Sequence, residues 1–585
     1  MMHSATSSKQ NFIKYARAFI LAWILCTGYS HAALETSESE ELRNRAKQEA
    51  LERERQLKLP SVKLQGVIER PETLRLPPFE TPCFKIQNFV LEVPSQVSPE
   101  AQRYGASTLP LDRFRFAQDF LEQYAGQCIG REGINIIVKG LTAIILEQGY
   151  STTRLGILEQ DLSGGTLKLT LIPGLIHELR FEDKATTGTW KNAFPTSAGK
   201  LLNLRDIEQG LEQMKRIPSQ EVDMQIVPAD KLGESDIVIN VKRSKPWKVT
   251  ATLDDAGAKG TGKLQAGLNL AIDNLFNIND LFNIGVSSDG DNKYDQRGTQ
   301  GNNIYYSIPY GNWTHSLSAN ESQYHQRVVG TFQTFLSSGK SSGIEFKTAY
   351  MFHRDQSGKS SVQFRTGRRW GQSFIDDTEI LVQRRETSFA EIALQHKRNI
   401  AQAQLDVTIA ERQGMPWFGA QKDLSDKPAG SPTFLYSLEI LDATLSIPFE
   451  LGKQPIKYTA TFHGQNSDSA LYGSEWIAIG NRWTVRGFDG EYSLAAENGW
   501  YFRNEFETFL PGTSHAAYIA LDAGRVFGAN EPNLIGNDLS GTAIGMRGYM
   551  FKGFYYDAFV SWPLNKPQGF NTSEPATGFS LNYQL

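Results

Sequence analysis

The sequence predicts a transmembrane β-barrel of about sixteen antiparallel strands, preceded by two small α+β modules and an N-terminal helix. Two observations indicate the barrel. From residue 246 to residue 585, apolar and polar residues alternate in short segments that are separated by Gly, Asn, Asp and Ser turns. The apolar content is 40%, yet no segment after the N-terminus reaches the roughly 18 consecutive apolar residues of a membrane helix.

Residues 1–33 have the pattern of a secretory signal peptide. Three basic residues between positions 9 and 17 precede an apolar segment, residues 18–29, which is too short to span a bilayer. Residues 30–33 then offer small residues for cleavage. An uncleaved anchor is the alternative. The net charge of −4 gives no support to nucleic acid as a partner.

Two of the three cysteines, Cys83 and Cys128, lie beyond the predicted signal peptide. An even pair in an exported chain predicts a disulfide. Closing a loop of about 45 residues would stabilise the fold by about 4 kcal/mol. A metal site is the alternative, but no His lies at ligand spacing from either cysteine, so we expect no metal and no cofactor.

Residues 34–59 predict a helix, because strong helix formers follow one another, with acidic residues concentrated early. Only Leu42, Ala46, Ala50 and Leu57 are candidates for an apolar face. A helix that is polar all round does not belong in a hydrophobic core. Composition leaves two interpretations open: a solvated tail, or a plug that stands in a polar channel.

Residues 60–82 are rich in proline and predict an extended linker. Two α+β modules follow, at residues 83–175 and 176–245, and their similar order of elements suggests a repeat. Their edge strands could accept an incoming extended chain by strand addition. The expected elements are strands at 84–91 and 167–174 with helices at 111–126 and 134–148, then strands at 177–182, 222–228 and 236–241 with a helix at 203–216.

Residues 246–585 predict the barrel itself. About 340 residues, at roughly 20 per strand and turn, give about sixteen strands. One face of each alternating segment is apolar and suits lipid, and the other is mixed or polar and suits a wet lumen, as at residues 344–352. The last segment, residues 578–585, alternates to its end, as expected of a strand that closes a barrel. A large soluble β-sandwich is the alternative.

The segment 257–264 nearly matches the consensus sequence of a phosphate-binding P-loop, but two features argue against that interpretation. Leu264 stands where Ser or Thr would bind magnesium, and the next segment predicts a strand instead of a helix. We therefore expect a hairpin turn there. No catalytic constellation appears elsewhere, so we expect no enzymatic activity and no export driven by nucleotide hydrolysis in this chain.

Asp522 is a carboxylate inside a predicted strand. Ile519, Leu521 and Ala523 form the natural lipid face of that strand, so Asp522 points into the lumen. An inward carboxylate inside a barrel requires a cation. Arg486 lies on a predicted turn and could reach Asp522 from a loop that folds inward.

Arg486 can bind a carboxylate through two parallel hydrogen bonds. At about 4 Å and an effective dielectric constant near 20, the attraction is about 4 kcal/mol. Solvation in a wet channel reduces that contribution to about 1–3 kcal/mol. An isolated surface arginine is the alternative.

Taken together, these segments resemble the TpsB outer-membrane transporters of two-partner secretion, the ShlB/FhaC/HecB group, within the superfamily of the barrel-assembly protein BamA. The resemblance covers nearly the whole mature chain. Its motifs are Cys83 and Cys128 framing the first module, Gln160–Gly165 (QDLSGG), Leu202–Ile207 (LNLRDI), Tyr306–Gly311 (YSIPYG), Val485-Arg486-Gly487-Phe488, and Leu521-Asp522-Ala523-Gly524.

The resemblance implies that both modules are periplasmic POTRA domains, that residues 34–59 form a plug helix, and that the barrel has sixteen strands in the outer membrane. It also implies that the loop bearing Val485 to Phe488 folds into the barrel, where Arg486 contacts the strand bearing Asp522 and Gly524. Such barrels often end in an aromatic residue, whereas this chain ends in Leu585.

The implied function is a pore that recognises and secretes a large exoprotein. The POTRA domains would bind this TpsA-type partner, which would then thread through the barrel. A CdiB-like transporter would secrete a contact-dependent inhibition toxin; a haemolysin or an adhesin are the other candidates. We expect a monomer, embedded in outer-membrane lipid and inserted by the barrel-assembly machinery. The alternative function is an assembly insertase of the BamA type.

Overall fold

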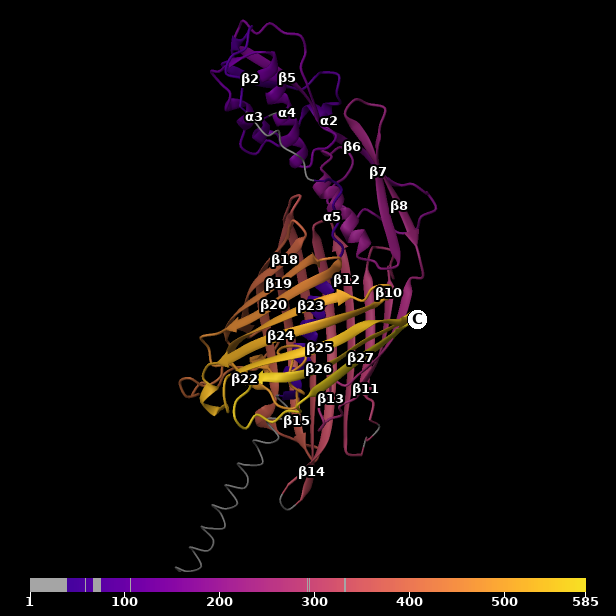
Figure 1. The fold of residues 1–585 in the computed structure, drawn as a ribbon, viewed down its shortest axis with the longest axis vertical. Helices are drawn as coiled ribbons and strands as arrows, with labels where there is room; N and C mark the ends of the chain where they lie inside the picture. Colours follow the sequence, from indigo (N-terminus) through magenta and orange to yellow (C-terminus); the bar gives the residue numbers. More distant parts are fainter. Residues whose placement is uncertain are drawn as a thin grey trace, which may run out of the picture.

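A computed structural model describes residues 39–57, 59–66, 75–105, 107–291, 293, 295–330 and 333–585. The predicted signal peptide, residues 1–33, lies outside the described residues. Two small modules extend from one end of a large β-barrel (Figure 1). Among the described helices, none is both long enough and apolar enough to cross a membrane.

The barrel is closed and antiparallel, as predicted. Sixteen strands form its wall, and the two-residue strand β16 (Thr378–Glu379) pairs with β15 alone. The last strand pairs with the first and closes the sheet. The strands are β9 (Trp247–Asp254), β10 (Gln265–Asp273), β11 (Leu281–Asp289), β12 (Arg297–Tyr310), β13 (Trp313–Val329), β14 (Thr334–Arg354), β15 (Gly358–Ile375), β17 (Arg385–Ile400), β18 (Ala403–Met415), β19 (Ser437–Leu451), β20 (Gln454–Asn466), β23 (Asn498–Phe509), β24 (His515–Phe527), β25 (Asp538–Phe551), β26 (Phe554–Asn565) and β27 (Ala576–Gln584).

The alternation in the sequence sets which side chains face outward. On β14, Ile344 and Phe346 are exposed on the outer face, whereas Glu345 between them pairs with Arg365 and Arg369 of β15. Successive side chains of a strand point to opposite faces, so charges meet inside the barrel and apolar groups cover the outside. The segment 257–264 connects β9 to β10, which confirms the hairpin reading.

The first module contains a three-stranded sheet in the order β2-β5-β4 and a separate pair, β1 with β3. The predicted strand at 84–91 is divided in two, and the predicted helix at 111–126 begins only at Arg115. The Asp112 carboxylate accepts the N–H groups of Thr108 and Leu109, which stabilises a turn there instead. The elements are β1 (Phe84–Lys85), β2 (Asn88–Glu92), α2 (Pro99–Gln102), α3 (Arg115–Glu122), β3 (Cys128–Ile129), α4 (Arg131–Glu147), β4 (Arg154–Gly156) and β5 (Thr166–Ile172).

The second module packs one helix on a three-stranded sheet, with β8 between β6 and β7. Asn203 caps the helix, because its side chain accepts the N–H of Arg205. Almost the whole helix is buried, since its other face contacts the barrel rim through Gln213 and Arg216. The elements are β6 (Leu175–Phe181), α5 (Leu204–Lys215), β7 (Gln220–Pro228) and β8 (Glu234–Arg243).

The predicted linker, residues 60–82, is only partly free of the modules. Residues 60–66 lie against the second module, and Val62 belongs to the apolar core of that module. Residues 67–74 lie outside the described residues. A short segment with alternating apolar residues can pack on a module even where the surrounding composition predicts a linker.

Residues 39–57 are helical, and this N-terminal helix lies inside the barrel (Figure 1, indigo). At its start, Glu40 accepts a hydrogen bond from Thr261 in the β9–β10 loop, at the end of the barrel away from the modules. Nearer its end, Arg55 lies over the Tyr305 ring of β12. The helix therefore runs along the lumen, the position expected of a plug and not of a solvated tail.

Candidate functional site in the barrel interior

A loop between β20 and β23, residues 467–497, folds into the barrel and is called the inward loop below. It carries the short 3-10 helix η2 (Gly473–Glu475) and the paired strands β21 (Ile477–Ile479) and β22 (Leu494–Ala496). Its apolar side chains form a buried cluster with the barrel wall. The cluster comprises Ile477, Ile479, Val485, Phe488, Leu494, Ala496, Tyr501, Val526, Leu539 and Phe570.

Arg486 lies at the inner end of this loop and binds Asp522 of β24. The Nε of Arg486 donates to Asp522 Oδ2 at 2.7 Å, and Nη2 donates to Oδ1 at 2.9 Å. The backbone N–H of Arg486 donates to the same Oδ2 at 3.0 Å. Arg486 is 5% exposed and Asp522 3% exposed. Such a two-point contact between desolvated ions is the strongest geometry available to this pair.

Three further charged groups, Glu505, Arg547 and Asp557, continue from the pair along the wall. Arg486 Nη1 also donates to Glu505 of β23, and Glu505 accepts from Arg547 of β25 at 2.9 Å. Arg547 in turn contacts Asp557 of β26 at 3.2 Å. The inward faces of four adjacent strands thus carry a chain of alternating charges. Removing one member leaves its neighbours without compensation in a site that water reaches poorly.

Val485 and Phe488 anchor the loop on either side of Arg486. Val485 is fully buried, and the Phe488 ring meets Phe570 edge to face with centroids 5.3 Å apart. Gly487 has φ +119°, a conformation that residues with a Cβ rarely adopt. The backbone therefore turns sharply just after Arg486, which aims the guanidinium at the wall.

Two glycines of the wall allow the loop to approach closely. A Cβ built on Gly541 of β25 would lie 2.0 Å from the Arg486 carbonyl oxygen and 2.9 Å from the Gly487 Cα. A Cβ on Gly524 would lie 2.9 Å from Val485 Cγ2 and 3.1 Å from Ile479 Cγ2. At Gly541 the contacts are with backbone atoms and are shorter than real Cβ atoms show, so the loop fits there only against glycine; at Gly524 the neighbouring atoms would have to shift.

We expect Gly541→Ala to displace the inward loop. The new methyl group meets backbone atoms that cannot rotate away, and overpacking of this kind costs about 1–3 kcal/mol, equivalent to roughly 5- to 150-fold in an equilibrium constant. Secretion of the partner that the family resemblance implies, measured by immunoblot of the medium, should fall accordingly. Gly371→Ala on β15 is the matched control, because its Cβ would meet only Arg385 Cβ, at 3.7 Å. Equal secretion by both variants would contradict the close-approach argument.

A second ionic centre lies at Glu475 of the inward loop. This carboxylate is 3% exposed and lies 2.9 Å from Arg369 of β15, 3.5 Å from Arg412 of β18 and 3.6 Å from Arg45 of the N-terminal helix. It therefore joins three parts of the molecule that are far apart in the chain: the wall, the inward loop and the helix. A second carboxylate, Glu391 of β17, accepts from Arg412 at 2.8 Å.

The N-terminal helix contacts its surroundings mainly through charges. Arg53 donates to the Tyr501 hydroxyl at 2.7 Å and lies 3.4 Å from Asp442. Glu52 lies 3.4 Å from Lys347 Nζ, and Lys47 lies 3.8 Å from Asp254. Its one buried apolar contact places Leu42 against Ala478, Ala495 and Trp476 of the inward loop. A helix bound by scattered ion pairs and one small apolar patch can leave without exposing a hydrophobic face.

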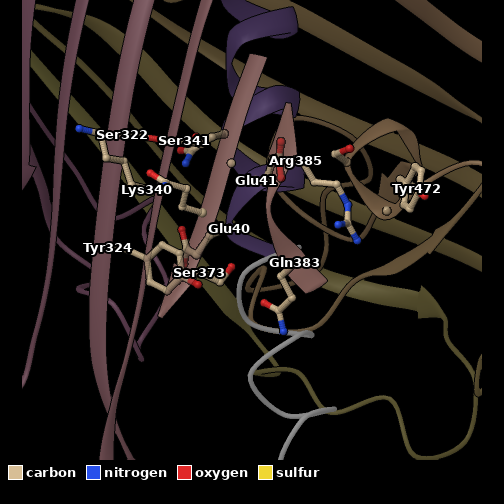
Figure 2. A pocket seen from close by; sticks show the side chains of 15 residues that line it. Glu40, Glu41, Ser322, Tyr324, Lys340, Ser341, Ser373, Gln383, Arg385 and Tyr472 are labelled. Carbon is tan, nitrogen blue, oxygen red and sulfur yellow. Dashed lines mark hydrogen bonds between the residues drawn. The ribbon is translucent and has the colours of Figure 1, made fainter. Parts of the chain in front are cut away.

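A polar cavity lies beside the start of this helix. Glu40 and Glu41 face β13 and β14, which contribute Ser322, Tyr324, Lys340 and Ser341 (Figure 2). On the other side lie Arg385 and Tyr472, the latter from the inward loop. Among the described residues, no aliphatic side chain lines this cavity, so the lumen beside the start of the helix is suited to water.

The other predicted positions lie outside the barrel. Cys83 and Cys128 form a disulfide with Cα atoms 5.5 Å apart, which joins β1 to β3 in the first module. In the described part of the chain, no group of three or more His, Cys, Asp or Glu side chains is arranged to bind a metal ion.

Sequence reasoning did not identify Glu475, Glu505, Arg547 or Gly541. A signal was available for Arg547, which is directly opposite Asp557 on the neighbouring strand. The same cross-strand alternation of charge relates Arg365, Glu391 and Arg412. Glu475 and Gly541 have no local signal, because each is defined by a contact with a distant segment.

Comparison with known proteins agrees with this architecture. Residues 233–548 match the family described as haemolysin secretion/activation protein ShlB/FhaC/HecB, and residues 105–174 and 175–228 match POTRA domains, the first of ShlB type. The outer membrane transporter CdiB-2 of Burkholderia pseudomallei (strain 1026b) is 45% identical over 545 residues, 92% of each chain. The hemolysin transporter protein ShlB of Serratia marcescens is 28% identical, over 68% of this chain and 71% of its own. The structure of CdiB from Acinetobacter baumannii is similar with a TM-score of 0.82 at 26% identity, covering 94% of this chain and 99% of that one.

Proposed function

Because the chain belongs to the ShlB/FhaC/HecB family of haemolysin secretion/activation proteins, we propose that it is an outer-membrane pore that secretes a large exoprotein in two-partner secretion. The observation that carries this proposal is the content of the barrel. A polar lumen holds a helix that is bound largely by ion pairs, among them Arg45–Glu475 and Arg53–Asp442, whereas an apolar cluster fixes the inward loop to the wall. The helix can therefore be exchanged for an unfolded chain while the loop stays in place, and little apolar surface is exposed.

The exported partner binds the two POTRA modules in the periplasm and then threads through the barrel. A contact-dependent inhibition toxin of the CdiA type is the favoured partner, supported by 45% identity to a CdiB-2 transporter; a haemolysin or an adhesin are the other candidates. The chain acts as a monomer, without enzymatic activity, and the barrel-assembly machinery inserts it. Arg486 and Asp522 fix the inward loop to the wall during this cycle.

An assembly insertase of the BamA type is the second candidate. Two features favour secretion over assembly. The described residues contain two modules, fewer than an insertase normally carries, and a helix occupies the lumen. An insertase acts on barrel strands at its wall and has no need of such a helix.

Deleting residues 83–241 should abolish binding of the partner's N-terminal region, because both modules would be lost. The partner is identified as the very large exported protein encoded beside this chain. Purified full-length and deleted proteins are compared in detergent by pull-down with that region as the immobilised ligand. Deletion of residues 39–57 is the control and should leave binding intact. Binding that survives loss of the modules would show that another part of the chain recognises the partner.

A further inference from the structure

Residues 61–65, which follow the N-terminal helix, lie on α5 of the second module and form no assigned β-strand there. Val62 N–H donates to Glu212 Oε1 and Leu64 N–H donates to Glu208 Oε1, each at 2.8 Å. Val62 is 7% exposed and packs in the module core with Leu64, whereas Lys63 between them is exposed. The segment therefore presents a strand's alternation, apolar inward and polar outward.

The spacing of the two α5 carboxylates matches the spacing of main-chain N–H groups in an extended segment. Glu208 and Glu212 are one helical turn apart, about 6 Å along the axis, and the N–H groups of alternate strand residues are about 6.6 Å apart. The two carboxylates thus receive Val62 and Leu64, the two N–H groups that face the helix. The groove contacts only the main chain and two apolar side chains of the segment. Other extended segments with apolar residues at alternate positions can therefore bind in the same way.

The two carboxylates are fixed by neighbouring cations. Arg354, at the end of β14, lies 2.7 Å from Glu212 and 3.2 Å from Glu208, and Lys359 lies 2.7 Å from Glu212. Burial alone would raise the pKa of Glu212, but hydrogen bonds and charges from Arg354 and Lys359 keep that pKa below its ordinary value. Arg354 Nη2 also donates to the Val62 carbonyl at 2.7 Å. Both donors and acceptors are therefore in place for a strand's main chain.

We propose that this groove, formed by Glu208 and Glu212 of α5 with Arg354 of the barrel rim, is a docking site for an extended segment of the exported partner with apolar side chains at alternate positions. The proposal rests on the proposed function. In the resting structure, residues 61–65 of this chain occupy the groove. Residues 61–65 follow the N-terminal helix closely in the chain. A partner segment that replaces them therefore also releases the contact that holds this end of the helix to the second module. Arrival of the partner is thereby coupled to release of the plug.

The test uses purified full-length protein in detergent and a fluorescent peptide with the sequence of residues 59–66. In the variant Val62→Asp, Leu64→Asp the chain's own segment would have to place two carboxylates in the apolar core of the module, so it leaves the groove open. The peptide should bind this variant at least about tenfold more tightly than the wild type. Lys63→Asp, at the exposed position, is the matched control and should bind like the wild type.

Peptides with altered amides test the main-chain contacts. Methylation of the Val62 and Leu64 nitrogens removes both donors and should abolish binding to the open variant, whereas methylation of the Lys63 nitrogen should preserve it. A peptide with Ile at both apolar positions should bind, and one with Asp at both should not. Equal binding to wild type and open variant, or binding that survives the double methylation, would overturn the proposal.

A second measurement avoids dependence on the double variant. In Cys26→Ser, Leu64→Cys protein, maleimide labelling of the half-buried thiol should accelerate when excess peptide displaces the segment; an unchanged rate overturns the proposal. The partner's N-terminal region should compete with the labelled peptide. A fragment that binds the modules but does not compete would exclude this groove and leave the pore assignment intact, whereas a fragment that binds nowhere on the protein would overturn the pore assignment.

Discussion

Arg486→Ala should reduce secretion at least about tenfold while the barrel still inserts. The change leaves Asp522, which is almost completely buried, without its principal cation, and breaking a buried pair costs about 3–5 kcal/mol. The lost stabilisation displaces the inward loop but does not unfold the barrel, because the sixteen strands keep their own hydrogen bonds. Secretion is followed by immunoblot of the medium, and insertion by the heat-modifiable mobility of the folded barrel.

Two variants separate the specific effect from a general loss of charge. Arg384→Ala removes another arginine with a two-point carboxylate contact, to Glu379, but on an exposed part of the barrel, and should leave secretion unchanged. The double variant Arg486→Ala, Asp522→Ala removes both charges and should be thermally more stable than Arg486→Ala alone. Normal secretion by Arg486→Ala would show that the loop position does not matter for export.

The barrel could be predicted from the sequence because lipid and lumen impose opposite demands on alternate residues. Ile519 and Leu521 are expected to face lipid, and because successive side chains of a strand alternate, Asp522 is expected to face the lumen. An inward carboxylate then required a cation, and Arg486 beside a glycine was the available one. Local pattern and elementary electrostatics indicated the pair but left an isolated surface arginine as the alternative, and the resemblance to the family was needed to expect the loop inside the barrel.

The remaining interior could not be predicted, because its contacts join segments that are distant in the sequence. Nothing near Glu475 indicates that Arg45, about 430 positions earlier, approaches it. Gly541 reads as an ordinary glycine in a strand until the inward loop is placed against it. The composition around Val62 predicts a linker. Its contact with the carboxylates of α5 is visible only in the structure.

Deleting residues 39–57 should raise single-channel conductance in planar bilayers by roughly an order of magnitude, toward that of an open barrel of this size. The helix occupies the lumen along much of its length, from Glu40 beside Thr261 to Arg55 over Tyr305. With the helix removed, ions meet only the inward loop and the polar wall. Cells carrying the deletion should also become more sensitive to large antibiotics that the outer membrane normally excludes.

The same contacts predict how the intact protein responds to salt. Screening shortens from about 10 Å at 0.1 M to about 3 Å at 1 M, so partly exposed pairs such as Glu52–Lys347 and Lys47–Asp254 weaken. Openings of the wild-type channel should therefore become more frequent as salt rises, and the variant Arg45→Gln, Arg53→Gln should show frequent openings already at low salt. Leu51→Gln is the matched control, because this side chain is 44% exposed.

A conductance unaltered by deletion of the helix would show that the inward loop alone closes the channel. The ion pairs of the helix would then serve only to position the helix.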